Sequence, residues 1–294
     1  MCRLYGFRAT ELTKIECTLL HAQNALIVQS WKDRSGTSHL HGWGLAAYQN
    51  QRLHIERQAQ AAIEAEGFRR AASRAYSNTV LAHVRRATVG RIALENTHPF
   101  CHGPWAFVHN GTLPNFDSLR PRMVEMMTPE HRAAIRGETD SEHVFHLILS
   151  MNDAMPDRPL VETLRLSLGQ IVTWCHEIDP AARIGLNVLL TDGDRLVGSR
   201  WGRTLHYVER WGVHDCEICG FPHIRHDLRH SYRAVVIASE PISHESWREI
   251  PDSCVFAVTT RMALQIYFRW GAADQPVVVE GAPLDGLTFL GGQH

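Results

Sequence analysis

Alternating apolar and polar residues predict two groups of short strands, one near each end of the chain. The strand-like stretches before residue 112 are 2–7, 42–48, 52–58, 79–87 and 105–111. The later ones are 185–201, 232–240, 253–260 and 264–270. Within 185–201, Asp192 and Gly193 form a pair typical of a two-residue turn, so this stretch is predicted to be a hairpin.

The middle of the chain has the periodicity of helices. Over 140–151 four apolar residues recur at the spacing of one helix face, namely Val144, Leu147, Ile148 and Met151. The stretch 159–176 is also amphipathic, and the Ala-, Glu- and Arg-rich stretch 59–75 predicts an earlier helix. Strands, then helices, then strands favour an α+β protein of layered sheets over an alternating βαβ fold. We expect one domain over 2–294, with the polar, His-rich stretch 209–231 as an inserted loop.

The composition limits the function classes. A chain of 294 residues that is 44% hydrophobic can bury a large core. Its net charge is −1, so we expect neither nucleic acid nor a membrane surface as a partner. No apolar run approaches the ~18 residues of a membrane span, and no signal-peptide pattern is present. Seven scattered cysteines suit a reducing compartment better than a disulfide framework, so we expect a cytoplasmic protein.

The candidate chemistry begins at Cys2. A free cysteine is usually a small buried hydrophobic residue, and Cys2 could simply begin an edge strand. If Met1 is removed, however, Cys2 carries a thiol and a free α-amino group together. Such an amine has an ordinary pKa of roughly 7.7–8.0 and can act as a general base near neutral pH. This second interpretation requires an oxyanion hole and a substrate clamp elsewhere in the chain.

The stretch "HNG" at 109–111 could supply the oxyanion hole. The side-chain amide of Asn110 and the backbone N–H of Gly111 can both donate to a developing negative charge. Asn-Gly is also a common turn pair, which explains the two residues without any catalytic role.

The stretch "HVRRATVG" at 83–90 could supply part of a clamp. Arg85 is expected at a strand end, where a guanidinium can hold a carboxylate through two parallel hydrogen bonds. Thr88 and Gly90 are turn-type residues that could line the same pocket. Taken alone, Arg85 is better explained as a surface arginine at a strand end.

The stretch "ETDSEHV" at 138–144 begins the predicted central helix. Thr139 and Glu142 have the spacing of a capping box. Asp140 then lies in the first turn, where the helix dipole stabilises a negative charge. This is a complete structural explanation, but Asp140 could also face a pocket and hold an ammonium group.

Taken together and in this order, the motifs closely resemble those of class II glutamine amidotransferases, in the superfamily of N-terminal nucleophile (Ntn) hydrolases. The resemblance rests on the N-terminal Cys, "HVRRATVG", "NTHPF", "HNG" and "ETDSE", with "HGWGLAAY" at 41–48 similar to stand-alone members. It covers about residues 2–150 by motif and continues more loosely to the C-terminus.

The resemblance implies a four-layer αββα sandwich of two antiparallel sheets flanked by helices. It also implies a role for seven residues: the nucleophile Cys2, the oxyanion-hole residues Asn110 and Gly111, and the substrate-binding residues Arg85, Thr88, His98 and Asp140. No metal or organic cofactor is expected for the reaction. The implied activity is hydrolysis of the γ-amide of glutamine, or of a γ-glutamyl compound, through a Cys2 thioester.

Two alternatives remain open. Some stand-alone relatives remove a γ-glutamyl group from an intermediate of ergothioneine biosynthesis, so the chain could be a hydrolase of a small-thiol pathway. A different class is a non-catalytic partner subunit on the same scaffold. The sequence does not predict a second catalytic domain to consume ammonia, and a separate synthase is therefore a candidate partner.

One further motif is a C-x-x-C pair, Cys216 and Cys219. It is flanked by the histidines His214, His223, His226 and His230. We favour an ordinary polar loop here, because a second C-x-x-C pair is missing. A structural zinc site is the next interpretation, and a redox role the last, since the expected strand-to-helix context is absent.

Overall fold

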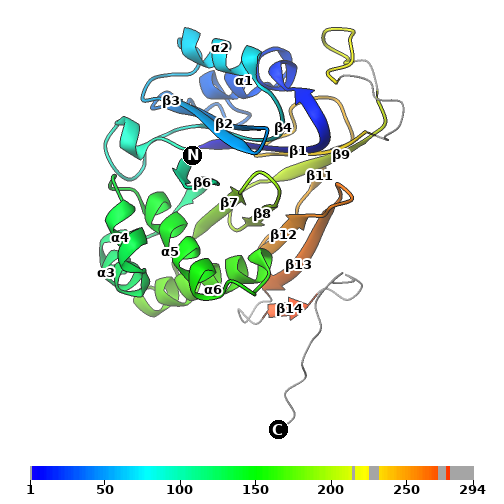
Figure 1. The fold of residues 1–294 in the computed structure, drawn as a ribbon. Helices are drawn as coiled ribbons and strands as arrows, with labels where there is room; N and C mark the ends of the chain where they lie inside the picture. The colour runs from blue at the N-terminus through cyan, green and yellow to red at the C-terminus, as the bar shows by residue number, and fades with distance from the viewer. Residues whose placement is uncertain (1, 214–215, 225–231, 271–275, 279–294) are drawn as a thin grey trace.

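The computed structural model describes residues 2–213, 216–224, 232–270 and 276–278. Within these residues the strands form two antiparallel sheets (Figure 1). The first sheet contains β1 (Arg3–Lys14), β2 (Trp43–Gln49), β3 (Arg52–Gln58), β4 (Tyr76–Val84), β9 (His206–Trp211), β10 (Arg233–Ala238) and β11 (Arg248–Glu249). The second contains β5 (Phe100–His102), β6 (Trp105–Thr112), β7 (Gly185–Thr191), β8 (Leu196–Arg200), β12 (Cys254–Val258), β13 (Leu264–Trp270) and β14 (Pro276–Val278).

The strand order places the first strand of the chain beside a late one. The first sheet runs β11-β9-β10-β1-β4-β2-β3, so β1 lies between β4 and the late strand β10. The second runs β14-β13-β12-β8-β7-β6-β5. Because β1 and β6 both lie inside their sheets, residues at their ends are held by neighbouring strands on both sides.

Helices cover the outer face of each sheet (Figure 1). The first sheet is covered by η1 (Cys17–His21), α1 (Leu26–Trp31) and α2 (Glu66–Arg74). The second is covered by α3 (Phe116–Met126), α4 (Pro129–Ala134), α5 (Asp140–Ala154) and α6 (Leu160–Ile178). A short helical turn, η2 (Leu94–Asn96), lies before β5.

The alternation of side chains along β1 shows how the layers stack. Leu4 packs in the core between the sheets, whereas Tyr5 and Phe7 pack in the core beneath the helices. Gly6 faces the second sheet so closely that an added Cβ would lie 2.5 Å from Cδ1 of Leu189. Strand β6 alternates in the same way. The described residues therefore form an αββα sandwich, as expected from the sequence.

Two predicted boundaries were wrong. The helix predicted at 59–75 begins only at Glu66, because Ala61, Ala62 and Ala65 are buried and Ala65 has an extended backbone. The loop predicted at 209–231 begins after Trp211, because residues 209–211 complete β9 and pair with β10. Of this loop, residues 214–215 and 225–231 lie outside the described residues.

Among the described residues, no helix combines the length and the apolar character needed to cross a bilayer.

Candidate active site

Cys2 directly precedes β1 at the middle of the first sheet. Its Sγ lies 3.4 Å from the carbonyl oxygen of Arg86 and accepts a hydrogen bond from the backbone N–H of Arg86 at 3.3 Å. Burial raises the pKa of the Cys2 thiol, although that N–H and the charge of Arg85 oppose the shift. At neutral pH the sulfur is therefore protonated, so its attack on a carbonyl carbon needs a base.

A buried ion-pair network fixes the backbone of Cys2. The guanidinium of Arg3 donates to the carbonyl oxygen of Cys2 at 3.0 Å. A second nitrogen of this guanidinium, Nη2, forms ion pairs with the carboxylates of Asp33 and Glu240, and it lies 2.8 Å from Oε1 of Glu240. Asp33 also accepts hydrogen bonds from the loop that follows α1, including one from Thr37 at 2.9 Å. The start of β1 is thus anchored from two directions.

Arg85 follows the end of β4, as predicted, and is 2% exposed. Its guanidinium donates to the carbonyl oxygens of Val89, Gly90 and Arg91 at 3.0, 3.2 and 3.0 Å. Burial lowers the pKa of Arg85, and the charges of Cys2 and Asp140 oppose this shift. Arg85 and Asp140 both act on the pKa of the Cys2 thiol, the first lowering it and the second raising it.

Asp140 begins α5, and both its carboxylate oxygens are held. The backbone N–H of Leu113, just after β6, donates to Oδ2 at 2.8 Å, and that of Ser141 donates to Oδ1 at 2.8 Å. These bonds fix the carboxylate at the junction of β6 and α5.

The predicted capping box is only half formed. Thr139 Oγ1 accepts from the N–H of Glu142 at 3.2 Å, which confirms the cap. The carboxylate of Glu142 instead accepts from the N–H groups of Arg136 and Gly137 at 2.9 and 2.6 Å. The Glu142 side chain therefore binds the loop before α5 and not the backbone N–H of the N-cap residue.

Asn110 lies near the end of β6 and reaches across to the first sheet. Its Nδ2 donates to Ser239 Oγ at 3.3 Å, and the backbone N–H of Leu4 donates to the same oxygen at 3.0 Å. The amide is thereby connected to β1 two residues beyond Cys2. A Cβ on the adjacent Gly111 would overlap the carbonyl oxygen of Gly185, so β6 and β7 approach closely at this point.

The last two candidates differ in their surroundings. Thr88 Oγ1 lies 3.1 Å from Thr112 Oγ1, so the loop after β4 contacts the end of β6. The ring of His98 is buried against the rings of His83 and Phe100, with centroids 4.1 and 4.6 Å away. Burial holds the pKa of His98 well below its usual range. Among the described residues, neither of its ring nitrogens has a hydrogen-bond partner.

Residues 1–265 match the family of class II glutamine amidotransferases. The chain belongs to this family. As a class II glutamine amidotransferase, it is an enzyme, and its Cys2 lies directly before β1 at the middle of the first sheet.

Curated relatives resemble the amidotransferase over most of its length. A probable glutamine amidotransferase of Saccharomyces cerevisiae, DUG3, is 24% identical and the alignment covers 90% of this chain and 83% of that one. The γ-glutamyl-hercynylcysteine sulfoxide hydrolase of Mycobacterium tuberculosis is 26% identical, over 89% and 94% of the two chains.

Solved structures share the fold of the amidotransferase. A glutamine aminotransferase class-II domain protein from Silicibacter pomeroyi aligns with a TM-score of 0.61 and 18% identity, over 90% of this chain and 98% of that one. The glutamine phosphoribosylpyrophosphate amidotransferase of Bacillus subtilis gives a TM-score of 0.60 at 18% identity, and 48% of its chain is covered. At these identities the likeness supports the fold alone.

Sequence reasoning missed the residues that hold the amidotransferase's N-terminus in place. Arg3, the first residue of β1, donates to the carbonyl oxygen of Cys2. The hydroxyl oxygen of Ser239 accepts a hydrogen bond from the backbone N–H of Leu4. Their roles depend on the pairing of β1 with β10, which joins residues more than 200 positions apart. The only sequence signal was the position of Ser239 at the end of a predicted strand.

Proposed function

We propose that this amidotransferase hydrolyses the γ-amide of glutamine, or of a γ-glutamyl compound, with Cys2 as the nucleophile. The observation that carries the proposal is the position of the Cys2 sulfur, which accepts a hydrogen bond at 3.3 Å from the N–H of Arg86, the residue directly after Arg85. The charges of Arg85 and Asp140 both act on the pKa of this thiol, and a cation and an anion near the nucleophile match the α-carboxylate and α-ammonium groups of a glutamyl substrate.

In this proposal Arg85 binds the α-carboxylate and Asp140 the α-ammonium, while Thr88 and His98 line the pocket. Three hydrogen bonds from Arg85 to backbone carbonyl oxygens leave part of its five N–H donors for a substrate. Asp140 likewise keeps lone pairs beyond those used by Leu113 and Ser141. The same bonds hold both charged groups rigidly, which lowers the entropic cost of binding.

The reaction requires removal of Met1, which frees the α-amino group of Cys2. That amine takes the proton of the thiol, directly or through a water, and the sulfur attacks the γ-carbonyl carbon. The side-chain amide of Asn110 and the N–H of Gly111 stabilise the oxyanion. The ammonium returns the proton to the leaving nitrogen as the C–N bond breaks. Water, activated by the same amine, then hydrolyses the thioester and releases glutamate.

The experiment is an assay of glutamate release by the full chain and two variants. Cys2→Ala is expected to abolish turnover while a glutamine analogue still binds. Cys101→Ala, which changes an exposed free thiol, is the matched control and is expected to keep full activity. Turnover that survives in Cys2→Ala would remove the nucleophile assignment.

The substrate clamp has a separate test. Arg85→Ala is expected to raise KM for substrates with a free α-carboxylate far more than for substrates in which that group is amidated. An equal increase in KM for both substrates would contradict the clamp, because it would reflect only the disturbed loop at 88–91.

A γ-glutamyl hydrolase of a small-thiol pathway is the second candidate. It is supported by the Mycobacterium tuberculosis relative, whose name is that of a γ-glutamyl hydrolase and whose alignment covers 94% of its length. A panel of γ-glutamyl amides compared with glutamine distinguishes the two, because the true leaving group gives the highest kcat/KM.

Two further questions concern partners and the N-terminus. Glutaminase activity that rises when a synthase is added would identify an ammonia-accepting partner. An intact Met1 in the mature protein, read by mass spectrometry, would instead favour a non-catalytic subunit.

A further inference from the structure

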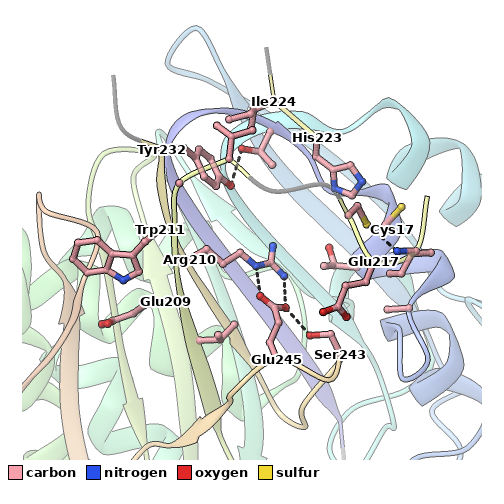
Figure 2. A pocket seen from close by; sticks show the side chains of 18 of the residues that line it. Cys17, Glu209, Arg210, Trp211, Glu217, His223, Ile224, Tyr232, Ser243 and Glu245 are labelled. Carbon is pink, nitrogen blue, oxygen red and sulfur yellow. Dashed lines mark hydrogen bonds and ion pairs between the residues drawn. The ribbon is translucent and has the colours of Figure 1, made fainter. Parts of the chain in front are cut away.

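A second cluster of reactive side chains lies away from Cys2, at the opposite end of β1. Cys17, at the start of η1, meets Cys216, Cys219 and His223 from the loop after β9. One ligand atom of each of the four residues lies within 4.8 Å of every other. Figure 2 shows Cys17 and His223 at the same end of a pocket that also contains the ion pair of Arg210 and Glu245.

We propose that Cys17, Cys216, Cys219 and His223 bind one zinc ion that is structural and not catalytic. Three thiolates and one imidazole form a common tetrahedral donor set for Zn²⁺. With Zn–S bonds of about 2.3 Å, tetrahedral geometry places sulfur atoms about 3.8 Å apart. All four ligand atoms lie within 4.8 Å of one another, and Cys219 Sγ lies 3.2 Å from Nε2 of His223, so small side-chain movements bring them to a common ion. Because the protein supplies all four ligands, no coordination position is left for a substrate.

The turn between the two loop cysteines directs both sulfurs to one side. The N–H of Gly220 donates to the carbonyl oxygen of Cys216 at 2.8 Å, and Gly220 has a φ of 75° that favours glycine. The N–H of Cys216 in turn donates to the carbonyl oxygen of Phe221 at 3.1 Å. The N–H of Ile218 donates to Cys216 Sγ at 3.4 Å, and such a bond stabilises a metal-bound thiolate.

Among the described residues of this loop, Ile224 packs against the core of the first sheet, but few other contacts order the segment 216–224. Ile218 and Phe221 are exposed, at 41% and 72%, so they contribute little burial. The segment contacts the body of the protein through the N–H of Lys14, which donates to the carbonyl oxygen of His223 at 2.9 Å, and through a bridge between Thr13 and Ile224. A metal would therefore join the loop to the end of β1 and close one wall of the pocket of about 590 Å³.

The sequence could not reveal this set. The C-x-x-C pair lacked a second pair nearby, and the third cysteine of the set, Cys17, comes from a position almost 200 residues earlier. Of the flanking histidines, His223 joins the cluster, whereas His214, His226 and His230 lie outside the described residues.

The test is the zinc content of the full chain, purified without chelators and without a metal-affinity tag. We expect one zinc per chain, and less than a tenth of that in Cys17→Ser and in Cys219→Ser. Cys101→Ser is the matched control, because Cys101 is an exposed free thiol outside the cluster. A histidine cluster of His102, His131 and His146 could hold metal as well. Zinc that is lost in His146→Gln and retained in Cys17→Ser would overturn the proposal.

A measurement on the unaltered protein covers the case in which the cysteine variants do not fold. A mercurial that modifies thiols should release the zinc as three protected thiols react, and removing the ion with a strong chelator should lower the melting temperature until Zn²⁺ is restored. A zinc-free protein with an unchanged melting temperature would overturn the proposal. So would a disulfide between two of the three cluster cysteines, located by mass spectrometry of peptides from the unreduced protein. Because Cys2 is outside this cluster, glutamate release tests the proposed function independently.

Discussion

Replacement of Arg3 by methionine tests how the N-terminal residue is held. The Arg3 side chain is 8% exposed, and its guanidinium pairs with Asp33 and Glu240, whose side chains are 1% and 8% exposed. Burial by itself would raise the pKa of Asp33, but hydrogen bonds from Ser35 and Thr37, together with the Arg3 charge, hold it well below its usual range. Arg3→Met removes the cation that both buried carboxylates contact and leaves Asp33 with the ring of His39, 2.9 Å away, whose pKa burial lowers to about 4.

Breaking a buried ion pair by removing one partner costs about 3–5 kcal/mol, because the remaining charge is uncompensated. Arg3→Met is therefore expected to lower the free energy of unfolding by about 3–5 kcal/mol. For a chain of this size each kcal/mol corresponds to about 2–4 °C, so the melting temperature should fall by roughly 6–20 °C. The variant also loses the hydrogen bond to the Cys2 carbonyl oxygen, and kcat should fall because the nucleophile is less well positioned.

Urea unfolding and glutamate release measure the two effects. Arg52→Met is the matched control, because Arg52 is exposed on β3, and it should change stability by less than about 0.5 kcal/mol. Adding Asp33→Asn to Arg3→Met should recover part of the loss, since one of the unpaired charges is removed. A loss of less than about 1 kcal/mol in Arg3→Met, the size expected of an exposed pair, would refute this reasoning.

Three other predictions follow from the same structure. One extra glycine before Cys2 removes the free amine from that residue and should lower kcat by about 10²–10⁴-fold relative to a chain that begins at Cys2, whereas equal rates would exclude the amine as base. Gly111→Ala should destabilise the protein by about 1–3 kcal/mol, because the added Cβ overlaps the carbonyl oxygen of Gly185; an unchanged urea midpoint would contradict that close approach. Burial lowers the pKa of His83 from 6.5 to about 3. Below pH 6.5 the unfolded chain therefore binds a proton at this residue that the folded chain does not bind, and the free energy of unfolding falls as the pH falls. His83→Phe should remove about 2 kcal/mol of the stability lost between pH 7 and pH 5, and a variant as acid-sensitive as the parent would count against a neutral buried ring.

The sequence by itself determined the local elements and their faces. The pattern at 2–7 predicted a strand, which forms the start of β1, and Asp192-Gly193 predicted the turn between β7 and β8, where Gly193 has a φ of 100°. Thr139 correctly predicted the start of α5. These signals are local, because side-chain period, turn conformation and helix capping involve residues only a few positions apart.

Only the tertiary structure decided which distant residues meet. Ser239 Oγ accepts hydrogen bonds from the side chain of Asn110 and from the backbone N–H of Leu4. Both bonds exist because β10 pairs with β1 and the second sheet packs against the first. Cys17 meets Cys219 for a similar reason, since the end of β1 lies beside the loop after β9. Such contacts depend on strand register and sheet packing over more than 100 residues, and no local pattern in the chain specifies them.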